Sequence, residues 1–130
     1  MDRTPLKILG PEQVLFVGSY TIGSSGAVAT SVGWGATCAR SSQGVYTLTF
    51  DTKFPYVQAV DVKWRGIAGA ALTSESASRN IGWSYSATTG VLTISFLDAD
   101  DGLATNTELA SGEKFDVWVV AATRYALGQS

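Results

Sequence analysis

The sequence predicts an all-β fold, an antiparallel β-sandwich of jelly-roll type with about eight to nine strands. Three observations support this. Helical periodicity is almost absent, apolar and polar residues alternate in short segments, and Gly, Ser, Asn and Asp separate these segments. A chain of 130 residues is the size of one domain and can bury a core without disulfides or metal ions.

The first half of the predicted sandwich contains two hairpins and a further strand. The expected strands span residues 14–22, 27–32, 34–41, 45–50 and 57–64. Gly44 closes the second hairpin, where a tight turn needs a positive φ. The strand at 45–50 is expected to bury Tyr46, Leu48 and Phe50 and to turn its threonines outward. In the strand at 57–64, Val60, Val62 and Trp64 share the apolar face.

The second half contains one more hairpin and a long last strand. Its expected strands span residues 81–86, 91–97 and 115–123, with a short strand near 71–73 and a polar connection at 98–112. The hairpin turns at 87–90 and buries Leu92, Ile94 and Phe96. The last strand is apolar on both faces, which is typical of a central strand or of a subunit interface. We therefore expect Trp118, Val120 and Tyr125 to form an oligomer interface.

The chain is expected to have three parts: an extended arm at 1–13, the sandwich domain at 14–124, and a tail at 125–130. Prolines and a glycine prevent a helix in the arm. Its apolar residues, Leu6, Ile8 and Leu9, can lie on a partner's surface, and a disordered terminus is the alternative. The arm has no continuous apolar region, so no signal peptide is expected, and no apolar stretch is long enough to span a bilayer.

The composition argues against nucleic acid as a partner and favours packing between copies. Charged residues make up 15% of the chain, against roughly 25% in an average domain. The net charge is −2, and the basic residues are scattered singly, without the basic stripe of a nucleic-acid binder. A surface of small, uncharged residues suits a protein that packs against copies of itself more than a freely diffusing monomer.

The chain has no histidine, so catalysis by Ser-His-Asp or Cys-His groups and histidine-ligated zinc sites are excluded. The sequence therefore predicts a protein that is not an enzyme and holds no cofactor or metal. Its single cysteine, Cys38, cannot form an internal disulfide. We expect it to be a small buried residue, and an intermolecular disulfide at a symmetry axis is the alternative.

Carboxylates provide two further candidate sites. Asp98, Asp100 and Asp101 form the only acidic cluster, but they depart from the EF-hand spacing, which favours a solvated loop over calcium. A glycosidase would need two carboxylates at a set separation. Nothing in the sequence brings together any two of the candidates, which are Asp51, Asp61, Glu75 and Glu108.

The aromatic residues could stack on sugars or fill the core. The candidates are Trp34, Trp64, Trp83, Trp118, Tyr20, Tyr46, Tyr56, Tyr85 and Tyr125. Trp64 lies on an apolar strand face and is predicted to be a core residue, whereas the place of Trp83 stays open. A row of exposed aromatic residues would make the protein a carbohydrate- or receptor-binding module.

Three segments resemble small virion proteins encoded by tailed bacteriophages. At 38–50, CARSSQGVYTLTF contains an arginine-bearing strand, a Gly turn and a Gly-x-Tyr-Thr-x-Thr strand, and the pair Phe54-Pro55 follows. The segment at 14–27, VLFVGSYTIGSSGA, resembles the start of the same proteins, and LASGEKFDVWVV at 109–120 resembles their end. The pattern is also similar to the trimeric complement-head and tumour-necrosis-factor-like jelly rolls, which pack aromatic last strands around a threefold axis.

The resemblance implies a structural protein of the virion. Such proteins decorate capsids, form head fibres or attach tails, and they have no catalytic residues to transfer. The expectation is a homotrimeric decoration or cement protein, made in the host cytoplasm, that binds the major capsid protein through its arm. The alternative is a carbohydrate- or host-receptor-binding module of a phage fibre or tail. Neither nucleic acid nor a membrane is an expected partner.

Overall fold

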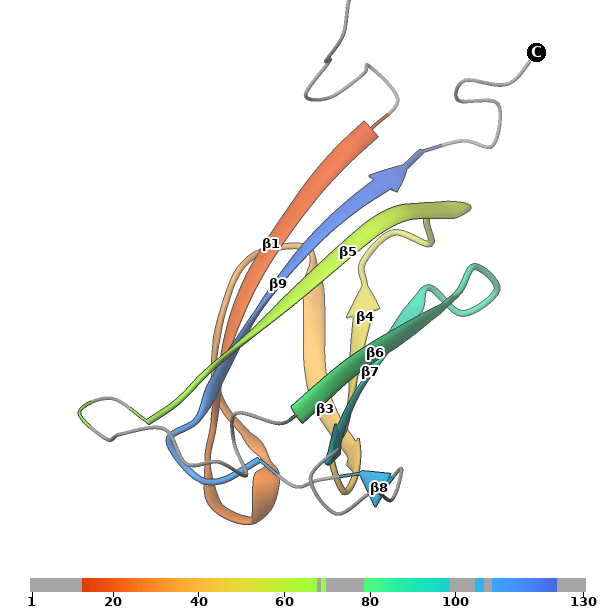
Figure 1. Ribbon diagram of the computed structural model, residues 1–130. Helices are drawn as coiled ribbons and strands as arrows, with labels where there is room; N and C mark the ends of the chain where they lie inside the picture. Colours follow the sequence, from red (N-terminus) through yellow and green to blue (C-terminus); the bar gives the residue numbers. More distant parts are fainter. Residues whose placement is uncertain (1–12, 68, 70–78, 99–104, 107–108, 124–130) are drawn as a thin grey trace, which may run out of the picture.

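The computed structural model describes residues 13–67, 69, 79–98, 105–106 and 109–123. These residues form two antiparallel sheets packed face to face, as Figure 1 shows. The predicted antiparallel β-sandwich is confirmed, whereas the jelly-roll subtype stays a prediction. The only helical element in the described part of the chain is one short 3-10 turn at Ser24–Gly26.

Sheet A has, among the described residues, four strands in the order β2-β1-β9-β5. Their bounds are Val28–Val32 for β2, Gln13–Ile22 for β1, Lys114–Ala122 for β9 and Tyr56–Arg65 for β5. The last strand therefore lies between the first strand and β5, pairing antiparallel with both. The strand with two apolar faces is thus an inner strand of its sheet, which is one of the two alternatives that its pattern left open.

In the part of the chain that the structure describes, sheet B has five strands, four of them in the order β3-β4-β7-β6. Their bounds are Ala36–Ser42 for β3, Val45–Phe50 for β4, Val91–Asp98 for β7 and Arg79–Ser86 for β6, and the short β8, Thr105–Asn106, pairs with β7. The predicted hairpins β3-β4 and β6-β7 both form. Gly44, in the first of these turns, has the positive φ of 68° that the hairpin requires.

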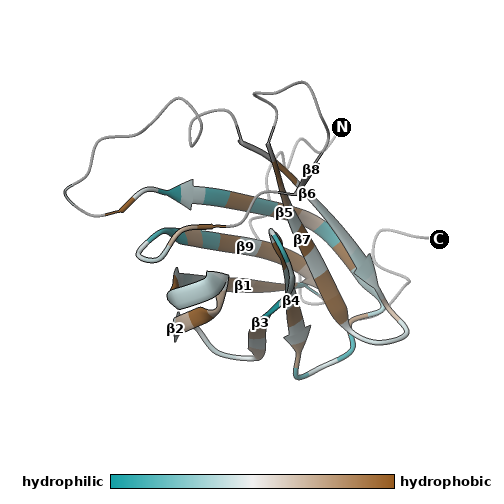
Figure 2. Cartoon of the chain, turned by 90° about the horizontal axis from the view of Figure 1, so that it is seen from below, coloured by the Kyte–Doolittle hydropathy of each residue, from teal (hydrophilic) through white to brown (hydrophobic). Residues whose placement is uncertain are grey.

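Alternation along each strand divides its residues between the core and the outer face, and apolar and polar bands alternate along the strands in Figure 2. The buried core comprises Phe16, Tyr20, Ile22, Cys38, Tyr46, Leu48, Phe50, Phe54, Leu92, Ile94, Phe96, Leu109, Phe115, Val117, Val119 and Ala121. Every residue predicted to be buried in β4 and β7 is found there. Trp64 packs against this core from β5 and is partly buried, which confirms its predicted place.

An aromatic cluster joins the two sheets. The ring of Phe115 from sheet A lies 5.3 Å from the rings of Tyr46 and Phe96 of sheet B, measured between centroids. These separations are typical of favourable aromatic pairs. The Tyr46 hydroxyl donates a 2.6 Å hydrogen bond to the Gly26 carbonyl, so its polar end is satisfied inside the core.

Most strand bounds differ from the prediction by one or two residues, and the differences at Trp34 and Gln13 are the informative ones. Trp34 was expected to begin the third strand, but β3 begins at Ala36. Gly33 and Gly35 have φ values of 138° and 89°, which are incompatible with extended strand backbone. Gln13, expected in the arm, pairs with Ala122 as the first residue of β1. Arm residues Leu6, Ile8 and Leu9 and the expected strand at 71–73 lie outside the described residues.

The place of Trp83, left open by the sequence, follows from its register. Trp83 pairs with Ile94 and so lies on the inner face of sheet B. Its side chain is nevertheless 43% exposed, because β6 ends the strand order of sheet B among the described residues. Trp83 is therefore a half-covered inner-face residue rather than part of an outward aromatic row.

Candidate interaction surface on sheet A

The outer face of sheet A is set by the register between its first and last strands. Leu15 pairs with Val120 and Val17 with Trp118. The neighbours of these residues along β9, Val117 and Val119, are fully buried. Since strand side chains alternate between faces, Leu15, Val17, Trp118 and Val120 all point outward.

One half of the outer face is apolar, and we call it the apolar patch. It comprises Leu15, Val17, Val32, Trp118 and Val120. Val32 joins it from β2, where it pairs with Ser19. Large apolar side chains are unusually exposed here: 44% for Leu15, 64% for Val32 and 49% for Trp118. Contiguous exposed apolar surface of this kind typically marks a contact with another molecule.

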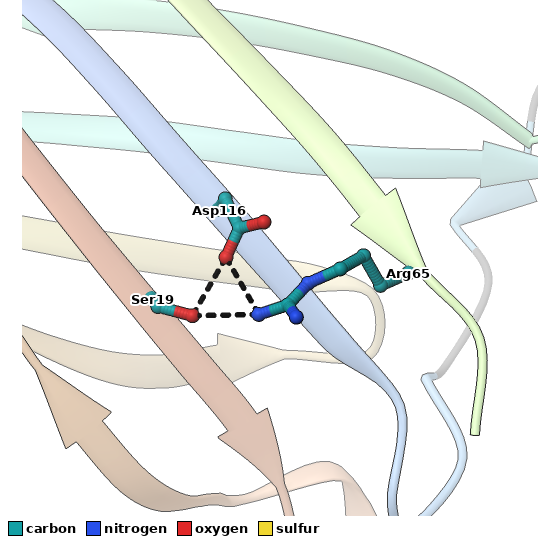
Figure 3. A network of polar contacts seen from close by, with 3 residues as sticks. All are labelled: Ser19, Arg65 and Asp116. Carbon is teal, nitrogen blue, oxygen red and sulfur yellow. Dashed lines mark hydrogen bonds and ion pairs between the residues drawn. The ribbon is translucent and has the colours of Figure 1, made fainter. Parts of the chain in front are cut away.

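The other half of the outer face is polar, and Figure 3 shows its central network. The Arg65 guanidinium donates through Nη2 to Asp116 Oδ1 and to Ser19 Oγ, both at 2.9 Å. Ser19 Oγ in turn donates to Asp116 Oδ1 at 2.6 Å. One residue comes from each of β5, β1 and β9, so the network ties three strands together beside the apolar patch.

A hollow of about 270 Å³ lies where the two halves meet. Its walls are Val17, Gly18, Ser19, Val32, Asp116 and Trp118. The hollow therefore combines an indole ring and two valines with a carboxylate. This combination can accept an apolar group that also carries a hydrogen-bond donor.

Trp34 lies in the loop that follows Val32, a wall of this hollow, and is the most exposed large apolar residue in the described part of the chain. Its side chain is 92% exposed. The preceding residue, Gly33, lies against β1: a Cβ added to it would be 2.8 Å from the Val17 carbonyl oxygen and 3.1 Å from Gly18 Cα. The loop between β2 and β3 is thus held on the strand that lines the hollow.

The outer face of sheet B differs in character. Thr47 pairs with both Ala39 and Thr93, and Thr93 pairs with Ser84. These residues lie on the face opposite the buried Leu48 and Leu92. They form an uncharged row of small side chains, as the composition indicated, without large apolar residues among them.

The structure brings together part of the predicted interface. Trp118 and Val120 share the outer face of sheet A, whereas Tyr125 lies outside the described residues. Sequence reasoning missed Leu15, Val17, Val32, Arg65 and the exposed position of Trp34. A signal for Leu15 and Val17 existed: the segment at 14–17 is apolar on both faces, as the last strand is.

Cys38 is buried, as predicted, against the core of sheet B. Burial raises the pKa of its thiol to about 12, so the reactive thiolate is disfavoured. Glu113 is the buried carboxylate of the described residues; it accepts a 2.6 Å hydrogen bond from Trp64 Nε1 and another from the Ala110 amide. These hydrogen bonds hold the turn before β9 in place, so the role of Glu113 is structural.

Within the described ranges, no three potential ligands gather as a metal site would require. The side chain of Asp98 and all of Asp100 and Asp101 lie outside those ranges, so the calcium alternative stays a prediction. Among the described residues, no helix has the length and apolarity to cross a bilayer.

Comparisons of this chain with protein-family models, with curated proteins and with solved structures find no match.

Proposed function

We propose that this protein is a non-catalytic structural protein of a tailed-phage virion, which assembles as a homotrimer and decorates the capsid shell. The observation that carries the proposal is the apolar patch on sheet A. A protein that works by burying surface needs an exposed apolar face, and Leu15, Val32 and Trp118 provide one at 44%, 64% and 49% exposure. The virion context comes from the resemblance of the segments at 14–27, 38–50 and 109–120.

The arrangement of sheet A supports self-association. The apolar patch is bordered on one side by Asp116, Arg65 and Ser19, so an apolar centre meets a polar margin, as in stable protein interfaces. A tryptophan in such a patch is the kind of residue that dominates binding energy. Trp118 lies on β9, the central strand, so backbone pairing on both sides holds its position.

Trimer formation would provide the decoration function through avidity. Three copies of a capsid-binding segment on one assembly bind with a higher effective concentration than a single copy. The arm residues Leu6, Ile8 and Leu9 are proposed to contact the major capsid protein. The arm joins the sandwich at Gln13, the first residue of β1.

The first test is the solution mass of the purified protein, measured by light scattering with and without decoration-free capsids. A trimer that co-sediments with capsids in a fixed, saturating ratio supports the proposal. A chain that stays monomeric and does not co-sediment contradicts it. Deleting residues 1–12 should abolish capsid binding without changing the number of copies in the assembly, and unchanged capsid binding would refute the role of the arm.

A second candidate function, binding of carbohydrate or a host receptor, is favoured by one observation. The hollow places the Trp118 ring beside the Asp116 carboxylate, and aromatic rings with adjacent polar groups can stack on and hydrogen-bond a sugar. Both functions would use the same face. A change in tryptophan fluorescence with one member of a glycan panel, absent in Trp118→Ala, would favour this candidate, and an unchanged spectrum across the panel would count against it.

A further inference from the structure

We propose that Trp34 of one copy inserts into the hollow of a second copy, between Val17, Val32 and Trp118, and donates its indole N–H to Asp116. The inference rests on the proposed self-association and specifies the contact that produces it. Each copy would thus provide both an inserting side chain, Trp34, and a hollow that receives the Trp34 of another copy.

The hollow has the size and lining for an indole ring. It measures about 270 Å³, and an apolar cavity of about 150 Å³ already holds a benzene molecule. The two valines and the Trp118 ring supply apolar contact for the faces of the inserted ring. Buried aromatic pairs add to the stabilisation that burial of their area provides.

Trp34 is presented for insertion by the backbone around it. Gly33 and Gly35 have φ values of 138° and 89°, in the region that favours glycine. Gly33 also lies too close to Val17 to carry a side chain. The two glycines thus keep Trp34 out of the neighbouring strands. Trp34 is 92% exposed and does not pack on its own sheet.

Hydrogen-bond complementarity selects an indole for this hollow. Both described hydrogen bonds of the Asp116 carboxylate end at Oδ1, from Ser19 at 2.6 Å and from Arg65 at 2.9 Å. In Figure 3 the other oxygen of Asp116 receives no dashed line from the residues drawn. A carboxylate has about four acceptor positions, so Oδ2 can accept the indole N–H, a donor that usually finds a partner when buried.

A second copy is the occupant because the chain supplies both halves of the contact but does not join them itself. Trp34 remains exposed in its own chain, yet its loop is held on Val17, which lines the hollow. When two different sites on identical chains meet head to tail, the contact is heterologous, and it closes into a ring when the rotation allows. Three copies related in this way form a closed trimer, in which every Trp34 is inserted and every hollow is filled.

The test is self-association of the full chain, measured by light scattering and sedimentation over a concentration series. Trp34→Ala should raise the dissociation constant by about 30-fold or more, the effect of losing an interface hot spot. The matched control is Trp83→Ala, which removes an exposed tryptophan of sheet B and should leave assembly unchanged. Circular dichroism and thermal unfolding of each variant show that the protomer still folds.

A double-mutant cycle tests the pairing with Asp116. Trp34→Phe keeps an aromatic ring and removes the N–H, and Asp116→Ala removes the acceptor. The two substitutions together should weaken assembly by less than the product of their separate effects, because they remove the same hydrogen bond. Fully independent effects would overturn the pairing.

The outcomes separate this inference from the proposed function. If the wild-type chain is monomeric at all concentrations, self-association and this inference both fail. If Val17→Lys dissociates the assembly while Trp34→Ala assembles as the wild type does, the apolar patch is the interface and the insertion of Trp34 is refuted.

Discussion

At the scale of single residues, burial and hydrogen bonding explain the behaviour of the polar groups in the core. Tyr46 lies fully buried, with its hydroxyl bonded to the Gly26 carbonyl, and Cys38 is buried in the same core as a small, weakly polar side chain. Burial also raises the pKa of Tyr20 above its usual range. Each of these side chains contributes to stability through its neutral form.

The hydrogen bond of Tyr46 can be removed without removing its ring. Tyr46→Phe leaves the buried Gly26 carbonyl without this donor, so we expect the free energy of unfolding to fall by about 1–3 kcal/mol. Urea unfolding of both chains measures the difference. Tyr56→Phe, at an exposed tyrosine, is the control and should change it little; equal effects would show that the buried bond contributes nothing special.

The raised pKa of Cys38 predicts how the free energy of unfolding changes with pH in the alkaline range. The thiol of the unfolded chain ionises near its ordinary pKa of 9.0, whereas burial raises the pKa in the folded chain to about 12. Between these values the unfolded chain binds fewer protons than the folded chain, so the free energy of unfolding falls as pH rises. The contribution is fully present below pH 9 and is lost toward pH 12.

Urea unfolding across this pH range should show a shallower decline for Cys38→Ala than for the wild type. Parallel pH profiles would contradict the assignment. The raised pKa also predicts that the native thiol reacts much more slowly with a thiol reagent at about pH 8 than the thiol of the urea-unfolded chain.

At the scale of elements, the conformation of the loop between β2 and β3 depends on one residue, Gly33. Gly33 combines a φ of 138° with backbone atoms of Val17 and Gly18 within 3.1 Å of an added Cβ. Both features exclude a side chain, and Val17 is also a wall of the hollow. The loop and the apolar patch are therefore coupled through one glycine.

Gly33→Ala should lower the free energy of unfolding by about 1–3 kcal/mol, because the new Cβ meets backbone and the φ is strained. Gly82→Ala is the matched control: an added Cβ there meets nothing within 4 Å. Its effect should stay within about 0.5 kcal/mol. Thermal and urea unfolding measure both, and a neutral Gly33→Ala would show that the loop readily moves off β1.

At the scale of the whole molecule, the two outer faces of the sandwich differ. Sheet A has the apolar patch and the polar network beside it, whereas a row of small, uncharged residues crosses the middle of sheet B: Ala39, Thr47, Thr93 and Ser84. The proposal assigns self-association to the first face alone. A charge placed on either face should leave the protomer folded, because the side chains replaced are not in the core.

Leu15→Glu places a charge within the apolar patch, at a side chain that is 44% exposed in the protomer. We expect it to yield monomers, since an unpaired charge in an apolar interface is costly to desolvate. Thr93→Glu, on the outer face of sheet B, should leave the assembly intact. Light scattering measures both variants; dissociation by Thr93→Glu but not by Leu15→Glu would move the interface to the other sheet.

Alternation alone determined much of this protein: the all-β class, most strand bounds to within one or two residues, and the inner faces of β4, β5 and β7. These are local properties, because successive side chains of any strand point to opposite faces. The outward positions of Trp118 and Val120 followed from the same rule. The differences at Gln13 and Trp34 lie at strand ends, where local patterns are weakest.

Only the tertiary structure decided which residues lie next to one another on the outer face of sheet A. Ser19 and Asp116 are 97 positions apart, and their hydrogen bond depends on β1 pairing with β9 in one register. The same pairing sets Val17 beside Trp118, and β2 adds Val32 to complete the hollow. Strand order and register arise from the packing of the whole core, so no local segment of the sequence contains them.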